Sequence, residues 1–248
     1  MRPFLLLWPI AVLAGCTPPT VTSDLPTTLD GPTAPARPAG IDNSWRSLIN
    51  EPLESVWKVD EKNDGHWVIR DGVLSYDGNG DTLWSVDSFG DVEIVLDWRW
   101  TQPPTDTARP VILPTGETAT NGDQPMTVMV MDAGDSGVYL RGSSKSQVNI
   151  WCWPCGSGEV YGYRTDASMP PMVRAGVTPT SNEDRPIGEW NRFLITIIGD
   201  ELTVALNGVT VLDHARLPGV ATTGTIALQH HWAPIEFANM YVRSVAAE

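Results

Sequence analysis

The feature that most constrains the fold of this chain is an alternation of apolar and polar residues. It occurs in two short runs, 135–141 and 147–151. In a β-strand, residues two apart share a face. The set expected to face a core is Ser136, Val138, Leu140, Val148 and Ile150. The set expected on the opposite face is Tyr139, Arg141, Gln147, Asn149 and Trp151. This pattern predicts an antiparallel sheet with one face on a core and one face open to solvent.

The open face carries rings, amides and a guanidinium, which are groups that suit a sugar. Aromatic rings pack on the C–H faces of a pyranose, and planar amides and guanidinium groups bind its hydroxyls in pairs. Tyr139, Trp151 and Tyr163, the last from a third alternating run at 159–163, are the candidate stacking rings. Eleven tryptophans are a surplus of the kind that sugar-binding proteins show. An ordinary solvent-exposed face is the alternative, and the pattern leaves both open.

Short strands separated by close turns run through residues 43–248. The clearest strand covers 91–100, where Val92, Ile94, Leu96, Trp98 and Trp100 share one face. Asp71-Gly72 and Asn207-Gly208 are hairpin turn signals. Segments 101–124 and 165–187 are rich in proline and are expected to be long loops, and no amphipathic helix is expected. About a dozen short strands of this kind predict an all-β fold, an antiparallel two-sheet jelly-roll sandwich.

The first 42 residues are expected to lie outside this domain. Residues 1–15 have the basic start, apolar run and small-residue ending of a secretory signal, and the run is too short to span a bilayer. The ending Leu-Ala-Gly-Cys16 resembles the bacterial lipobox, so Cys16 is the predicted lipidation site. Residues 16–42, rich in Pro, Thr, Ala and Ser, are the predicted tether. We therefore expect the protein to be located in the bacterial cell envelope and to contact the membrane only through the lipid. Plain secretion is the alternative.

Charge and cysteine content narrow the function classes. A formal net charge of −14 argues against a nucleic-acid partner, whereas a neutral carbohydrate is compatible with it. Cys152 and Cys155 form a C-x-x-C motif. A redox motif of this kind needs a helix after it, but here the glycine-rich residues 156–158 and a strand-like run follow. In an oxidising compartment a local disulfide between them is expected.

Several runs, taken in order, resemble one family, the 3-keto-disaccharide hydrolase domain. They are residues 45–48, 67–74, 90–99, 135–141, 188–191, 206–209 and 224–231. The resemblance implies a concanavalin-type jelly-roll sandwich, similar to laminarin-binding and glucanase folds. The activity that it implies is cleavage of the glycosidic bond of a sugar already oxidised to a ketone at C3.

The implied chemistry sets what the site must contain. A C3 ketone acidifies the C2 proton, so a base can remove it, the glycosidic oxygen leaves C1, and water adds back. Such a site needs a base, donors for the enolate oxygen, and an acid or a metal for the leaving group. It does not need the paired carboxylates of a standard glycosidase.

Three residues are the candidate catalytic groups. His231 is the preferred base, because an imidazole titrates near neutral pH; a histidine bound at a strand end is the alternative. Arg141 is the candidate oxyanion donor, with pairing to a carboxylate such as Asp97 as the alternative. Asp135 is a base or a hydroxyl acceptor, or else a turn former before glycine. A divalent metal held by His231 with Asp135 or Glu93 is a further hypothesis, and the sequence does not identify the metal.

The substrate-binding candidates are Tyr139, Gln147, Asn149, Trp151, Tyr163 and Gln229. Gln229 and His231 match the family's Gln-Asp-His and would share a face, with His230 pointing the other way. The family has Asn-Ser-Gly at 135–137 and Glu-Val-Gln at 147–149, so an acid and an amide are exchanged at Asp135 and Gln147. If these two side chains face each other, the carboxylate has only changed sides. A non-catalytic carbohydrate-binding module or a cell-surface interaction domain remains the alternative function.

Overall fold

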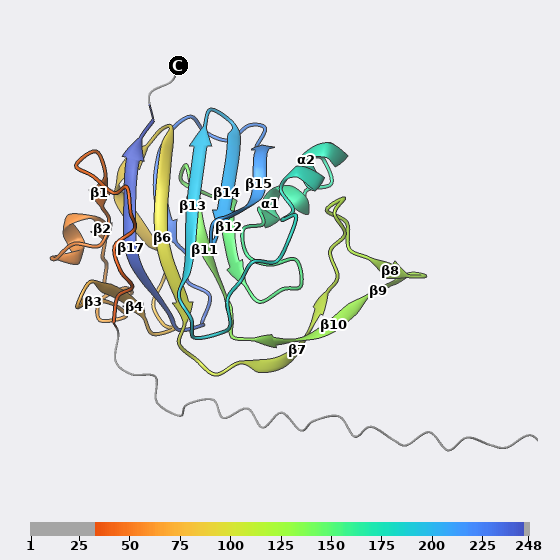
Figure 1. Cartoon of the computed structure of the whole chain (residues 1–248), viewed down its shortest axis with the longest axis horizontal. Coiled ribbons are helices and arrows are strands. Elements are labelled where there is room, and N and C mark those ends of the chain that lie inside the picture. The colour runs from red at the N-terminus through yellow and green to blue at the C-terminus, as the bar shows by residue number, and fades with distance from the viewer. Residues whose placement is uncertain (1–32, 246–248) are drawn as a thin grey trace, which may run out of the picture.

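Two antiparallel sheets make up the body of the protein in the computed structural model, which describes residues 33–245. The larger sheet has the order β15 (Val209–Arg216), β14 (Glu201–Leu206), β13 (Asn191–Ile198), β6 (Val92–Trp100), β17 (Ile235–Ser244), β4 (Val73–Tyr76) and β3 (Trp67–Arg70), with β1 (Arg46–Ser47) also on β17. The smaller sheet has the order β12 (Ser143–Trp151), β11 (Asp135–Leu140), β16 (Gly224–Leu228), β5 (Leu83–Phe89) and β2 (Trp57–Lys58). Figure 1 shows the smaller sheet behind the larger one. The predicted jelly-roll sandwich is confirmed.

The core lies between the sheets and contains the residues that the alternation assigned to it. On β6, the five residues of the predicted inner face, Val92 to Trp100 in steps of two, are at most 3% exposed. On the smaller sheet, Val138, Leu140, Val148 and Ile150 belong to the same buried cluster. Both hairpin signals are also confirmed, because Asp71-Gly72 joins β3 to β4 and Asn207-Gly208 joins β14 to β15, each with positive φ at both residues.

The outer face of the larger sheet is covered by ion pairs rather than by solvent alone. Glu93 pairs with Arg243, and the buried carboxylate of Asp97 receives two hydrogen bonds from Arg192. Carbonyls of residues 35–36 accept hydrogen bonds from the side chains of Arg192 and Asn239. The last part of the predicted tether therefore lies against this sheet.

Segment 101–124 is not a plain loop, as the sequence suggested. It contains β7 (Thr105–Pro110), which pairs with β10 (Thr127–Asp132) to form a two-stranded arm. Two shorter strands, β8 (Thr120–Asn121) and β9 (Gln124–Pro125), pair at the tip of this arm, which extends away from the sandwich in Figure 1. The sequence of β7 lacks apolar alternation because neither of its faces packs into the core.

Short helices are present where none was expected. Residues 159–163, expected to be a strand, enter α1 (Tyr161–Arg164), and the predicted loop 165–187 contains α2 (Pro171–Gly176). A 3-10 turn, η1 (Leu53–Ser55), precedes β2. The alternation at 159–163 predicted a strand wrongly, because its polar residue Glu159 does not lie on a solvent face. Glu159 and Arg164 are both buried, at 0% and 4% side-chain exposure, and form an ion pair within the protein. No helix within residues 33–245 is long and apolar enough to cross a membrane.

The predicted disulfide is wrong. Cys152 and Cys155 are free thiols with separate contacts, since the sulfur of Cys152 accepts the Ala133 N–H while Cys155 donates to Glu159. Burial raises the pKa of each thiol to about 11, which keeps both protonated. Cys16 and residues 1–15 lie outside the described residues, so the lipidation and signal-peptide predictions remain predictions.

The buried pair of Glu159 and Arg164 should be a main determinant of stability around α1. Glu159→Ala leaves the Arg164 charge buried without its partner, and we expect a loss of about 3–5 kcal/mol in the free energy of unfolding, measured by urea denaturation. The double variant Glu159→Leu with Arg164→Met should lose much less, because it removes both charges. Equal losses in the two variants would contradict a charge-based role.

Candidate functional site

A hollow of about 310 Å³ opens on the face of the smaller sheet that points away from the core. The strand register sets its floor, because Asp135 lies opposite Trp151 and Gly137 lies opposite Asn149. Its lining is Asp135, Gln147, Asn149, Trp151, Trp153, Tyr161, Gln229 and His231. Six of the nine predicted catalytic and binding residues therefore meet in one place.

A glycine makes the floor of the hollow flat enough for Gln147 to lie across it. A Cβ at Gly137 would stand 2.2 Å from Nε2 of Gln147, so any other residue would displace the Gln147 side chain from this position. The Gln147 amide donates to the Ser136 carbonyl at 3.1 Å and to Oε1 of Gln229. The two amides therefore hold each other in fixed orientations at the floor.

Asn149 presents an acceptor that the protein does not use. Its side chain is 3% exposed, and its Oδ1 is buried with no hydrogen-bond partner among the described residues. A buried polar atom without a partner costs on the order of 1–3 kcal/mol. A hydroxyl or N–H donor placed in the hollow by a ligand would remove that cost.

One wall of the hollow is aromatic. The rings of Trp151 and Trp153 stack at 4.1 Å with an angle of 4°, and Tyr161 meets Trp151 edge-on at 6.1 Å. The Trp151 indole N–H donates to the Gly156 carbonyl at 2.8 Å, which fixes the stack to the turn after β12. This wall is the surface on which a sugar ring or another flat group would pack.

Burial changes the proton affinities of Asp135 and His231 in opposite directions. The pKa of Asp135 is raised to about 7, mainly by desolvation, with Arg109 opposing the shift and Asp132 adding to it. Desolvation lowers the pKa of His231, and the positive charge of Arg109 adds to the effect. At neutral pH the imidazole is therefore neutral and the carboxyl is partly protonated.

Arg109 is the cation whose charge acts on both of these groups, and the sequence did not single it out. It lies on β7, pairs with Asp132 on β10 and approaches the Trp153 ring at 5.8 Å. Only the pairing of the arm brings it to the hollow, so no local pattern could have identified it.

Arg141 does not belong to the site. It occupies the turn after β11 with φ 54°, and its side chain is 2% exposed. The guanidinium donates to the Ala221 carbonyl at 2.7 Å and to Asp91 Oδ1 at 3.0 Å. The prediction of an oxyanion donor is wrong, and the alternative of carboxylate pairing holds with Asp91 in place of Asp97.

Two predicted stacking rings are also placed elsewhere. Tyr139 lies beside the hollow rather than on its lining, packed against Trp84 with ring centroids 5.6 Å apart. Tyr163 points into the core, where its hydroxyl donates to the Pro218 carbonyl. Residues two apart on a helix lie about 200° apart around its axis, so α1 turns Tyr161 to the hollow and Tyr163 away from it.

The expectation for the segment after β16 is confirmed. Gln229 and His231 both line the hollow, while His230 turns the other way and contacts the Tyr76 hydroxyl. The sheet pairing continues as far as the Gln229 N–H, which donates to the Gly137 carbonyl at 2.9 Å.

The exchange of acid and amide does not produce a direct pair. Asp135 and Gln147 share the hollow but are offset by four positions along β12, about 13 Å between Cα positions at the usual strand rise. The Gln147 amide donates its hydrogen bonds to the Ser136 carbonyl and the Gln229 side chain instead. The carboxylate has thus not simply changed sides.

The metal hypothesis has little support in the described part of the chain. Within residues 33–245 no group of three or more His, Cys, Asp or Glu side chains is arranged to hold a metal ion. Glu93, one of the ligands proposed to join His231, is paired with Arg243 on the outer face of the larger sheet.

Several solved structures have a similar fold, including two from Parabacteroides distasonis. A proposed glycosyl hydrolase from Parabacteroides distasonis aligns with a TM-score of 0.56 and 19% identity, covering 88% of this chain and 95% of that one. A second one from the same organism has a TM-score of 0.54 and 20% identity, covering 82% of this chain and all of that one. At these identities the likeness establishes the fold alone. A search of curated proteins found no match.

A family model matches most of the sandwich. It is described as a 3-keto-alpha-glucoside-1,2-lyase-like domain, and the match extends over residues 44–243, which include every residue that lines the hollow. The chain belongs to the 3-keto-alpha-glucoside-1,2-lyase-like domain family.

Proposed function

We propose that the protein is a carbohydrate-active enzyme that cleaves the glycosidic bond of 3-keto-glycosides, with 3-keto-disaccharides among them, in the hollow of the smaller sheet. The observation that carries the proposal is the pairing in one hollow of a carboxyl with a raised pKa and an imidazole with a lowered one. Family membership supports the same class of substrate.

The two shifts assign the roles. In water a carboxyl loses its proton well before an imidazolium does, so the carboxylate would be the base. Here burial brings the pKa of Asp135 to about 7 and takes that of His231 below its usual value. A single shared proton therefore resides on Asp135, which leaves His231 free to accept one.

The reaction follows from these roles. His231 takes the C2 proton, and the electron pair moves through C2 toward the C3 ketone oxygen as the enolate forms. The C1–O bond then breaks, and the leaving oxygen takes the proton of Asp135. Water adds to C1 of the resulting enone by the reverse transfers, giving its proton to Asp135 while His231 returns one to C2. The net reaction is hydrolysis, and both side chains end as they began.

Neighbouring groups can bind the sugar during these steps. The unpaired Oδ1 of Asn149 would accept a hydrogen bond from a sugar hydroxyl. The hydrogen-bonded amides of Gln147 and Gln229 offer polar groups in fixed positions at the floor of the hollow. The positive charge of Arg109 lies close enough to affect both titrating groups, so it also favours a developing enolate.

A carbohydrate-binding module without chemistry is the second candidate. The observation that favours it is the stacked wall of Trp151 and Trp153 beside the amides, which is sufficient for binding alone. Incubating the purified protein with 3-keto-glucosides, with and without a chelator, separates the two candidates. Release of the aglycone with a primary isotope effect from deuterium at C2 supports the enzyme; binding without release supports the module.

His231→Ala should remove turnover, because no other neutral imidazole lines the hollow among the described residues. We expect kcat/KM for a 3-keto-glucoside to fall by about 100-fold or more. The matched control is His230→Ala, which changes the neighbouring residue on the opposite side and should keep most activity. Full activity of the His231 variant would exclude it as the base.

The pH profile should report both groups. Activity should fall at low pH as His231 gains a proton, below its ordinary pKa, and fall again as pH rises through about 7 and Asp135 loses its proton. Asp135→Asn should lower kcat/KM by about 100-fold and abolish the limb near pH 7. Because ionised Asp135 is penalised only in the folded state, the variant should be at least as stable as the parent above pH 7. A limb that persists in the variant would assign it to another group.

We also propose that Cys16 anchors the protein to the envelope through lipid, with the outer membrane favoured over the inner one. In a bacterial host, Cys16→Ser should move the protein from the membrane fraction to the soluble envelope fraction, as judged by fractionation and immunoblotting. Mass spectrometry of the parent should find an acylated N-terminal cysteine. A parent protein that lacks the acyl group would contradict the anchor.

A further inference from the structure

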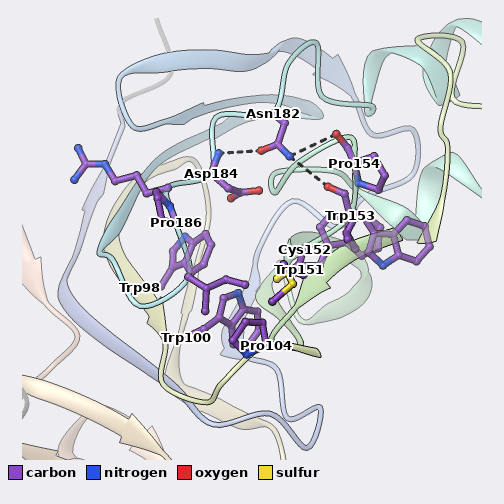
Figure 2. Close-up of a pocket in the computed structure, with 14 residues that line it drawn as sticks. Trp98, Trp100, Pro104, Trp151, Cys152, Trp153, Pro154, Asn182, Asp184 and Pro186 are labelled. Atoms are coloured by element: carbon purple, nitrogen blue, oxygen red, sulfur yellow. Dashed lines mark hydrogen bonds between the residues drawn. The ribbon is translucent and has the colours of Figure 1, made fainter. Parts of the chain in front are cut away.

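A second and larger hollow, of about 600 Å³, adjoins the first (Figure 2). Trp151 and Trp153 line both hollows, so the stacked pair stands where the two meet. The remaining lining comes from β6, the arm and the segment before β13. Neither the sequence patterns nor the reaction described above makes use of this space.

Rings are half of the residues that line this second hollow. Four tryptophans and three prolines line it, together with Val130, Met131 and Ile187. In Figure 2 the rings of Trp98, Trp100 and Pro104 lie on one side, while Asn182 and Asp184 lie on another. A wall of this composition favours groups that are flat and apolar.

Buried polar atoms without a partner lie on some of the same residues. The indole N–H groups of Trp98 and Trp100 have no acceptor in the described part of the chain, although the side chains are 1% and 3% exposed. Asp184 uses Oδ2 to accept the Ser157 N–H at 2.9 Å, while its Oδ1 is buried without a partner. Both a donor and an acceptor therefore await a partner around an apolar space.

We propose that the second hollow holds the aglycone of the substrate, a planar aromatic group of phenolic type. The sugar occupies the first hollow, so this assignment rests on the proposed function, and the glycosidic oxygen passes the edge of the Trp151 and Trp153 stack. The aromatic ring packs among the tryptophans, and a ring hydroxyl can donate to Oδ1 of Asp184 while its oxygen accepts from an indole N–H. Substrate choice then depends on the aglycone as much as on the sugar.

Binding of intact glucosides tests this assignment without turnover. We expect isothermal titration calorimetry to give a Kd about 10- to 100-fold lower for 2-naphthyl glucoside than for methyl glucoside, because the naphthyl ring removes apolar surface from water. Val130→Trp should fill the second hollow and abolish the difference. Val128→Trp, two residues earlier on the same strand and outside the lining, should keep it.

Each outcome decides one point. Equal Kd values for the two glucosides in the parent, or a naphthyl preference that survives in Val130→Trp, overturn the aglycone site. If Val130→Trp does not fold, Met131→Trp replaces it, since that lining side chain is 50% exposed, with Met129→Trp as its control. Cleavage of 3-keto-glucosides without any aglycone preference overturns this inference alone. A naphthyl preference lost in Val130→Trp, without any cleavage, overturns only the reaction.

Discussion

The pairing register of β11 with β12 determines both the core and the hollow. Because side chains alternate between faces, the register that buries Val138 and Val148 also places Asp135 and Asn149 together on the opposite face. A slip of one residue would exchange the two sets and destroy core and hollow together. Gly137 is part of the same constraint, because the absence of a Cβ leaves room for the Gln147 amide to lie across β11. The hollow is thus a consequence of how the sandwich forms.

Removal of water from this face turns a set of ordinary side chains into an acid and a base. Raising the pKa of Asp135 from 3.8 to about 7 corresponds to about 4 kcal/mol of penalty against its charged form. Arg109 offsets part of that penalty, which keeps the group near the point where it can both give and take a proton. The same surroundings disfavour a charged His231. In the proposed reaction, the roles of the two groups would therefore follow from burial, with no need for the paired carboxylates of standard glycosidases.

Local patterns in the sequence predict what depends on local geometry. Alternation predicted the faces of β6, β11 and β12, and turn residues predicted two hairpins. Of the residues in the hollow, Gln147, Asn149 and Trp151 followed from a shared face, whereas Asp135, Gln229 and His231 followed from the family resemblance. Arg109 could not be found, because its approach depends on an arm that pairs only with itself. Arg141 was misplaced because alternation was extended by one residue into a turn with positive φ. Tyr163 was misplaced because residues 161–164 form a helix instead of a strand, which turns Tyr161 and not Tyr163 to the hollow.

The two hollows are built by different parts of the fold. The floor of the first comes from paired strands, whose hydrogen bonds resist change, whereas the walls of the second come largely from the arm and the loop before β13. A two-stranded ribbon is only marginally stable by itself, and the arm leaves Val128 and Met129 exposed at 42% and 63%. Substitutions in the arm therefore cost the sandwich little while they reshape the space beside Trp153. Under the proposed function, the sheet would hold the reacting groups, while the arm and the loop before β13 would help to select the attached group.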